Sequence, residues 1–180
     1  MTETNGGIEL LSLEREEWAA LGRDPAGFAE TRRLDIGDQG DTLRQLGAGT
    51  AAFMARTGAG SRWGSFLAVD VDRRTLVGTC AYKGPPDPDG AVEIAYFTFP
   101  AYEGRGYATR MAALLTDRAA LPPPAVTVRA HTLPERNASV RILEKLGFAR
   151  LGQVIDPEDG PVWRWERAPG STPSLVSAKP

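Results

Sequence analysis

The chain has 180 residues, which is enough for one domain with a hydrophobic core and too few for two domains of ordinary size. Its formal net charge is −2, and no cluster of Lys and Arg indicates a nucleic-acid surface. No apolar segment approaches membrane-spanning length, and residues 1–7 lack the basic region and apolar core of a signal peptide.

Hydrophobic patterns divide the chain into alternating strands and helices. In chain order they predict a strand (8–13), two helices (14–21, 42–57), three strands (66–71, 76–83, 91–99), a helix from Tyr107 to the prolines at 122–124, a strand (125–131), a helix (135–146) and two strands (148–155, 161–166). This order predicts an α/β fold with a mixed sheet and one domain over residues 8–167. Residues 1–7 are expected to be flexible, and residues 168–180, rich in Pro, Ser and Gly, disordered.

The early part of the chain has the weakest pattern. Residues 23–41 are polar and broken by Pro25 and several glycines, so no element is predicted there. Gly47 and Gly49 weaken the helix predicted over residues 42–57.

The strands at 66–71 and 76–83 are separated by four residues and are therefore predicted to form an antiparallel hairpin. The second strand contains the single cysteine, Cys80, which can form no internal disulfide. A lone cysteine in an apolar run fits a reducing cytoplasm.

The most informative stretch runs from residue 91 to residue 110. Residues 91–99 are apolar and aromatic apart from Glu93, as is typical of a largely buried strand, and Pro100 ends that strand. Gly104 and Gly106 then allow a tight turn into a helix. A loop that ends at a helix N-terminus directs N–H groups and partial positive charge at one place, which favours a phosphate or diphosphate. The alternative is a turn whose glycines serve geometry alone.

The loop sequence EGRGYA, residues 103–108, resembles motif A of the GNAT superfamily of N-acetyltransferases, Gln/Arg-x-x-Gly-x-Gly/Ala. A P-loop would end in Gly-Lys-Ser/Thr, and a Rossmann fingerprint would need three spaced glycines. Glu103 departs from the family pattern, because a neutral or basic side chain is usual there. This carboxylate must point away from a diphosphate or be offset by Arg105.

Residues 137–148 carry a second resemblance to the same family, whose pattern is Asn-x-x-Ser/Ala followed by Tyr/Leu-Glu-Lys-x-Gly-Phe. In the family this Asn contacts the pantetheine arm of acetyl-CoA, and Asn137 takes that role by resemblance. Its alternative role is to cap a helix. The two motifs and the order of elements extend the resemblance over residues 8–167. They imply a mixed, mostly antiparallel sheet of six to seven strands flanked by about four helices.

Ser139 and residues 156–165 resemble the RimJ/RimL branch of the family, which acetylates ribosomal-protein N-termini. Many family members have a Tyr where Leu143 stands, and that Tyr protonates the departing CoA thiolate. Either the Ser139 hydroxyl or water is therefore expected to supply this proton. The alternative for Ser139 is local hydrogen bonding at the helix start.

The resemblance implies that acetyl-CoA is the co-substrate. Its thioester carbonyl would be held by N–H groups of the central strand near Phe97 to Phe99, because GNAT sheets splay between the fourth and fifth strands and leave such groups unpaired. The residues expected to bind acetyl-CoA are Phe97, Thr98, Phe99, Gly104, Arg105, Gly106, Tyr107, Ala108, Thr109 and Asn137.

Acetyl transfer to an amine requires a base that takes a proton from the ammonium form of the acceptor. Glu93, acting through water, is the first candidate, and His131 is the second; each can instead be purely structural. The catalytic residues are thus predicted to be Glu93, His131 and Ser139. The amine would attack the thioester directly within a ternary complex. One His and one Cys make a poor metal ligand set.

The acceptor is predicted to be a primary amine, either a protein N-terminus or a small molecule, and the irregular residues 23–57 are expected to shape its site. Because Glu103 and Leu143 depart from common family residues, the alternative is a weakly active domain that binds CoA as a sensor or interaction module. A cytoplasmic monomer or homodimer is expected, with no nucleic-acid or membrane partner.

Overall fold

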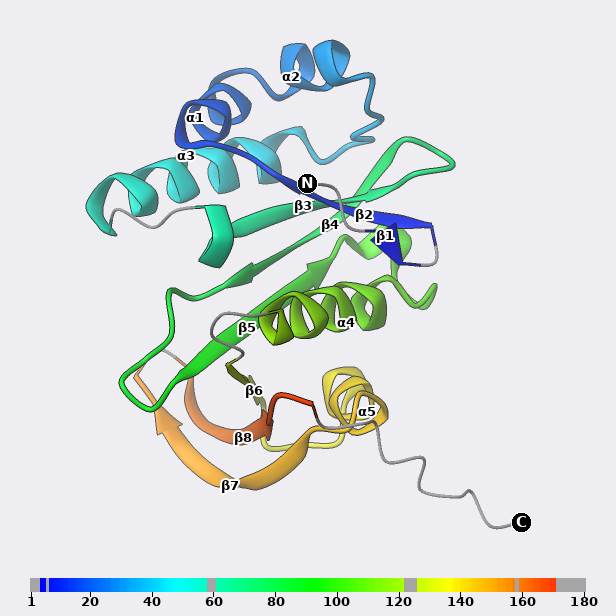
Figure 1. The fold of residues 1–180 in the computed structure, drawn as a ribbon. Helices are drawn as coiled ribbons and strands as arrows, with labels where there is room; N and C mark the ends of the chain where they lie inside the picture. Colours follow the sequence, from blue (N-terminus) through cyan, green and yellow to red (C-terminus); the bar gives the residue numbers. More distant parts are fainter. Residues whose placement is uncertain (1–3, 6, 58–60, 122–125, 158, 171–180) are drawn as a thin grey trace. The chain divides into compact units, whose positions relative to one another are not determined.

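The computed structural model describes residues 4–5, 7–57, 61–121, 126–157 and 159–170 (Figure 1). The chain divides into two units, of which unit 1 comprises Met1–Pro85 and Ala95–Leu115, and unit 2 comprises Pro86–Ile94 and Thr116–Pro180. The assignment of residues 8–167 to one domain stays a prediction. The segment 171–180, most of the tail expected to be disordered, lies outside the described residues, as do residues 1–3 and 6 of the expected flexible N-terminus.

The elements follow the predicted order. They are β1 (Thr4–Asn5), β2 (Ile8–Ser12), α1 (Arg15–Arg23), α2 (Pro25–Arg32), α3 (Gly40–Thr57), β3 (Ser65–Asp70), β4 (Thr75–Tyr82), β5 (Ala91–Thr98), α4 (Tyr107–Ala120), β6 (Thr127–Thr132), α5 (Ala138–Lys145), β7 (Ala149–Asp156) and β8 (Gly160–Arg167), with short 3₁₀ helices at Ser61–Trp63 and Pro100–Tyr102. The predicted α/β class is confirmed. Within the described residues β1 and α2 were not predicted.

Unit 1 has the strand order β1-β2-β3-β4-β5, and β1 to β4 pair antiparallel. The predicted hairpin of β3 and β4 is confirmed. Helices α1 and α3 contribute to a core with Leu67, Val69 and Leu76 of β3 and β4. The other face of these strands is covered as well. The Phe66 and Tyr82 rings are in edge contact, and the Tyr82 hydroxyl donates to the Leu115 carbonyl of α4. Strands buried on both faces are apolar along their whole length, which explains the apolar runs of β3 and β4.

Gly47, which weakens the helical pattern, is what allows α1 and α3 to approach. A Cβ at Gly47 would lie 2.5 Å from the Gly22 nitrogen and 2.7 Å from the Trp18 oxygen. The helix propensity lost at Gly47 is therefore offset by close packing between the two helices.

The prediction of an irregular segment at residues 23–41 is wrong for its first part. Asp24 caps α2 by accepting from the Gly27 N–H at 3.0 Å, and Pro25 occupies the first turn. Proline is tolerated at that position because its missing N–H would have had no helical acceptor. Pro25, which interrupts the sequence pattern, therefore begins a helix.

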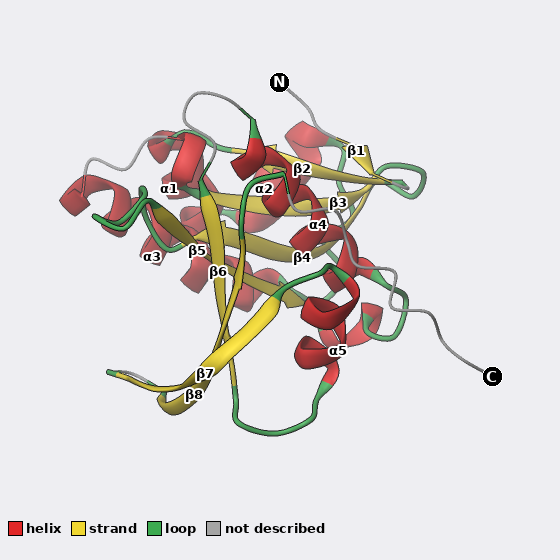
Figure 2. Ribbon diagram, turned by 60° about the horizontal axis from the view of Figure 1, so that its bottom comes forward, coloured by secondary structure: helices red, strands yellow, loops and turns green. Residues whose placement is uncertain are grey.

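Unit 2 has the strand order β5-β6-β8-β7, in which β5 and β6 are parallel and the other pairs antiparallel. Figure 2 shows β7 and β8 running side by side. Helix α5 begins at Ala138, three residues later than predicted, because Asn137 is its N-cap. No helix within the described residues is long and apolar enough to cross a membrane.

Candidate functional site

The loop before α4 is built by two glycines in unit 1. Gly104 and Gly106 have φ values of +74° and +80°, which other residues rarely adopt. A Cβ added to either glycine would meet no atom within 4 Å. The glycines are thus required by backbone conformation rather than by crowding, and the space beside them is open to a ligand.

The N–H groups of this loop are available. Within the described residues, no protein acceptor bonds the N–H groups of Gly104, Arg105 or Gly106. The N–H groups of Tyr107, Ala108 and Thr109 open α4 and have no intrahelical acceptor by helix geometry. Six consecutive N–H donors and the positive end of a 14-residue helix make this loop suited to an oxyanion.

The charged residues of the loop do not neutralise each other. Glu103 is exposed and forms no ion pair with any described residue. The Arg105 guanidinium lies 5.7 Å from the centre of the Tyr102 ring, so it stacks on that ring instead of meeting Glu103. Arg105 is exposed and can turn its charge to an anion.

Tyr107 is oriented away from solvent. Its ring is 4% exposed and its hydroxyl donates to Asp70, so the side chain belongs to the core of unit 1. Tyr107 can therefore contact a ligand through its N–H alone.

The strand β5 meets β4 closely at one place and opens at another. The Phe99 N–H donates to the Val77 carbonyl at 3.0 Å, and a Cβ at Gly78 would lie 2.3 Å from the Phe97 oxygen. A cavity of about 150 Å³ lies beside residues 79–81 and 95–97. The prediction of an unpaired N–H is therefore wrong for Phe99, whereas Phe97 lines the cavity.

Thr98, also predicted to bind the donor, has a buried hydroxyl with no hydrogen-bond partner among the described residues. A buried hydroxyl of this kind is costly unless a ligand or water satisfies it. This observation fits the expectation that the end of β5 contacts a ligand.

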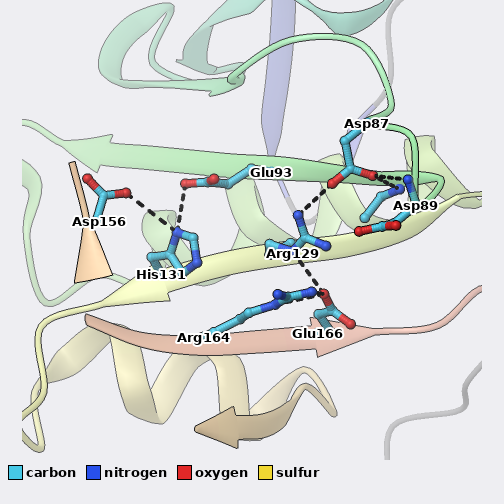
Figure 3. A network of polar contacts seen from close by, with 9 residues as sticks. Asp87, Asp89, Glu93, Arg129, His131, Asp156, Arg164 and Glu166 are labelled. Atoms are coloured by element: carbon cyan, nitrogen blue, oxygen red, sulfur yellow. Dashed lines mark hydrogen bonds and ion pairs between the residues drawn. The ribbon is translucent and has the colours of Figure 1, made fainter. Parts of the chain in front are cut away.

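Two of the predicted catalytic residues are in contact in unit 2 (Figure 3). Nδ1 of His131 lies 3.2 Å from Oε1 of Glu93 and 4.0 Å from Oδ2 of Asp156. All three side chains are mostly buried. Asp156 and Asp159 are close in the turn between β7 and β8, since the Asp159 N–H donates to Asp156 at 3.0 Å.

Arg129 forms a second polar network on the same face, which the sequence did not predict. It donates to Asp87 at 2.6 Å and to Glu166 at 2.8 Å, and Arg164 also donates to Glu166 (Figure 3). The register explains the shared face, because Arg129 is directly opposite both Glu93 of β5 and Glu166 of β8.

This network is electrostatically satisfied. Burial alone would raise the pKa of Glu166, but hydrogen bonds from Arg164 and Arg129 outweigh it and the pKa lies below its usual value. The Ala91 N–H and the Arg129 guanidinium likewise hold the pKa of Asp87 below its usual value. Both carboxylates are therefore ionised partners of Arg129 near neutral pH, which indicates a structural role.

The residues of α5 have distinct environments. Oδ1 of Asn137 accepts from the Val140 N–H at 3.0 Å, so the capping role is present and its Nδ2 is the group that remains for a ligand. Ser139 is in the first turn, and its hydroxyl makes no hydrogen bond to a described residue. Leu143 is fully buried in the position where a family Tyr would stand.

No group of three or more His, Cys, Asp or Glu side chains suited to a metal ion occurs among the described residues. Burial raises the pKa of the Cys80 thiol well above its usual value, so this thiol is not a nucleophile near neutral pH.

Comparisons with known proteins agree with the geometry. A family model described as an acetyltransferase (GNAT) domain matches residues 11–149. A ribosomal-protein-S5-alanine acetyltransferase from Vibrio fischeri has a similar structure, with a TM-score of 0.66 and 13% identity over 95% of this chain and 98% of that chain. RimL, a ribosomal L7/L12 alpha-N-protein acetyltransferase solved with coenzyme A, is also similar, with a TM-score of 0.65 and 14% identity over 93% of this chain and 98% of that chain. A mutant of the spermidine N-acetyltransferase SpeG from Vibrio cholerae has a TM-score of 0.62 and 16% identity over 91% of this chain and 95% of that chain. These identities show the fold alone. Comparison with curated protein sequences gave no match.

Proposed function

Because this chain belongs to the GNAT family of acetyltransferases, we propose that it transfers the acetyl group of acetyl-CoA to a primary amine through a ternary complex. The observation that carries the proposal is the loop at residues 104–106, whose N–H groups have no acceptor within the described residues. Such a loop can neutralise a diphosphate without a metal.

The proposed donor-binding residues are taken for each unit by itself. In unit 1 the N–H groups of residues 104–109 would hold the diphosphate, and Arg105 would add a positive charge. In unit 2 Nδ2 of Asn137 would donate to the pantetheine arm, the role that the family motif assigns to this Asn. In unit 1 the Thr98 hydroxyl, which has no partner among the described residues, would satisfy its hydrogen bond on the donor.

Glu93 and His131 would act together on the acceptor. Their 3.2 Å contact puts a carboxylate and an imidazole side by side, and either group can take the proton that the acceptor ammonium loses. The neutral amine would then form an N–C bond to the acetyl carbonyl carbon, the C–S bond would break, and the nitrogen would lose its second proton to solvent as the amide forms. The proton for the CoA thiolate would come from the Ser139 hydroxyl or from water.

Two classes of acceptor suit this reaction. Solved neighbours act on ribosomal proteins and on spermidine. The carboxylates near His131 favour a cationic acceptor, which describes both a protein N-terminus and a polyamine. The acceptor is therefore proposed as a protonated primary amine of either class.

The test is release of CoA from acetyl-CoA with a panel of N-terminal peptides and polyamines. An acetyltransferase turns over at least one acceptor with product that carries a single acetyl group by mass spectrometry. Tight acetyl-CoA binding with no turnover on any acceptor would instead support the alternative, a CoA-binding sensor or interaction module.

A further inference from the structure

The first residue of α4 is tied to the turn between β3 and β4. The Tyr107 hydroxyl donates to Oδ2 of Asp70 at 2.5 Å, and Nη1 of Arg73 lies 3.4 Å from the hydroxyl oxygen. Gly106, with its positive φ, directly precedes Tyr107. One end of the glycine loop is thereby fixed to a neighbouring hairpin within unit 1.

The Asp70 carboxylate, which accepts the hydrogen bond from Tyr107, is itself held by other donors. Oδ1 of Asp70 accepts the N–H groups of Asp72 and Arg73 at 3.1 and 3.0 Å, and Oδ2 also receives Arg73 Nη1 at 3.2 Å. Asp70 is only 6% exposed. Four donors therefore fix one carboxylate at the end of β3.

The ionisation states suit a strong bond. Burial alone would raise the pKa of Asp70, but hydrogen bonds from Tyr107 and Arg73 outweigh it, and the pKa lies below its usual value. Burial and the bond to Asp70 raise the pKa of Tyr107. Near neutral pH the pair is a phenol donating to a carboxylate, which is a charge-assisted hydrogen bond.

The loop itself has little else to hold its shape. Two glycines with positive φ leave its backbone conformationally free, and its own N–H groups make no bond to described residues. A loop that must be ordered on binding lowers affinity, and one that is already ordered does not.

Resting on the proposed function, we propose that Asp70 and Tyr107 are positioning residues that hold the N–H groups of residues 104–107 ready for the diphosphate of acetyl-CoA. Neither side chain contacts the donor. Their role is to fix where α4 begins, and with it the direction of the loop donors.

Tyr107→Phe tests this directly, because it keeps the ring and removes the bond. Tyr102→Phe is the matched control: Tyr102 flanks the other side of the loop, and its hydroxyl bonds no described residue. The Kd for acetyl-CoA is measured by calorimetry at a temperature where circular dichroism shows each protein folded. A merely structural role would lower the melting temperature and leave this Kd unchanged.

We expect the Kd of Tyr107→Phe to rise about tenfold, the usual worth of one hydrogen bond to a charged group, and that of Tyr102→Phe to stay unchanged. Asp70→Asn serves as the second variant if Tyr107→Phe does not fold, and should also weaken binding. A double variant should bind no more weakly than Tyr107→Phe alone. Wild-type affinity in folded Tyr107→Phe, or equal losses in both tyrosine variants, would overturn the positioning role. If the wild type itself binds no acetyl-CoA, the proposed function fails first.

Discussion

The glycine loop of unit 1 and the polar face of unit 2 differ in the hydrogen-bonding groups that they present. The loop presents main-chain N–H donors that no described residue accepts. The face presents side chains, and around Arg129 these already satisfy one another through Asp87 and Glu166. Available donors indicate binding, whereas a closed network indicates stability.

The polar face of unit 2 has two ends, at Arg129 and at His131, whose contacts differ in length. At the Arg129 end, two carboxylates hold one guanidinium at 2.6 and 2.8 Å. At the His131 end, the distances to Glu93 and Asp156 are 3.2 and 4.0 Å, so the imidazole is held less tightly. An imidazole nitrogen can accept or donate a proton, whereas a guanidinium stays protonated in proteins, so the proposal for proton transfer concerns His131 and not Arg129.

The largest effect on acetyl-CoA binding is expected from Gly106→Val in the glycine loop. A β-branched residue at a φ of +80° would force the loop to another shape and would turn its N–H groups away. We expect acetyl-CoA affinity measured by calorimetry to fall by more than about 100-fold, since several charge-assisted bonds are lost together. Gly49→Ala is the control, because Gly49 lies in α3 where a Cβ meets no atom within 4 Å. It should leave affinity unchanged and slightly raise the melting temperature.

The next largest effect should come from Glu93→Gln, which keeps the shape and removes the charge beside His131. We expect kcat to fall by about 10- to 100-fold, as is usual for a lost general base, with the Kd for acetyl-CoA unchanged. Arg164→Gln, on the same face, is the matched control and should retain kcat. If kcat survives in Glu93→Gln, proton removal must be assigned to another group.

Ser139→Ala should have a smaller effect. If its hydroxyl protonates the CoA thiolate, kcat falls by about tenfold, whereas donation by water predicts less than about twofold. Because Asn137, and not Ser139, caps α5, the melting temperature should not change. The rate is measured by CoA release at saturating acetyl-CoA. A large loss of stability would show instead that Ser139 supports the helix.

The smallest expected effect concerns the Arg129 network and pH. The folded-state pKa values of Asp87 and Glu166 lie below their usual values. Their contribution to stability is therefore fully present above about pH 4.5, the usual range of carboxyl pKa values, and is lost as the pH falls through the folded values. Arg129→Met should be less stable than the wild type at pH 7, and the gap in melting temperature should narrow by a few degrees towards pH 3. A gap that widens in acid would contradict the assignment.

Elements with strong local patterns were predictable from sequence. The hairpin of β3 and β4, the helix α4 and the glycine loop each depend on residues close together in the chain. The helix α2 is not predicted because a proline usually interrupts a helix, whereas Pro25 follows the capping residue Asp24 and occupies the first helical position. The late start of α5 has the same kind of cause, since Asn137 is the cap.

Side-chain networks were not predictable in the same way. Asp87 and Arg129 are 42 positions apart, and their contact depends on the parallel register of β5 and β6. The alternating polar residues of β6 and β8 were a signal for a polar face, but they do not say which charges meet. Glu93 and His131 were each candidates, yet their contact required the fold.

The most direct test of the account is a crystal structure of the wild-type protein with acetyl-CoA. We predict that diphosphate oxygens lie within hydrogen-bond distance of the N–H groups of Gly104 and Gly106, and that the Tyr107 hydroxyl remains bonded to Asp70. A diphosphate bound elsewhere, with these N–H groups facing solvent, would contradict the assignment on which the proposed function rests.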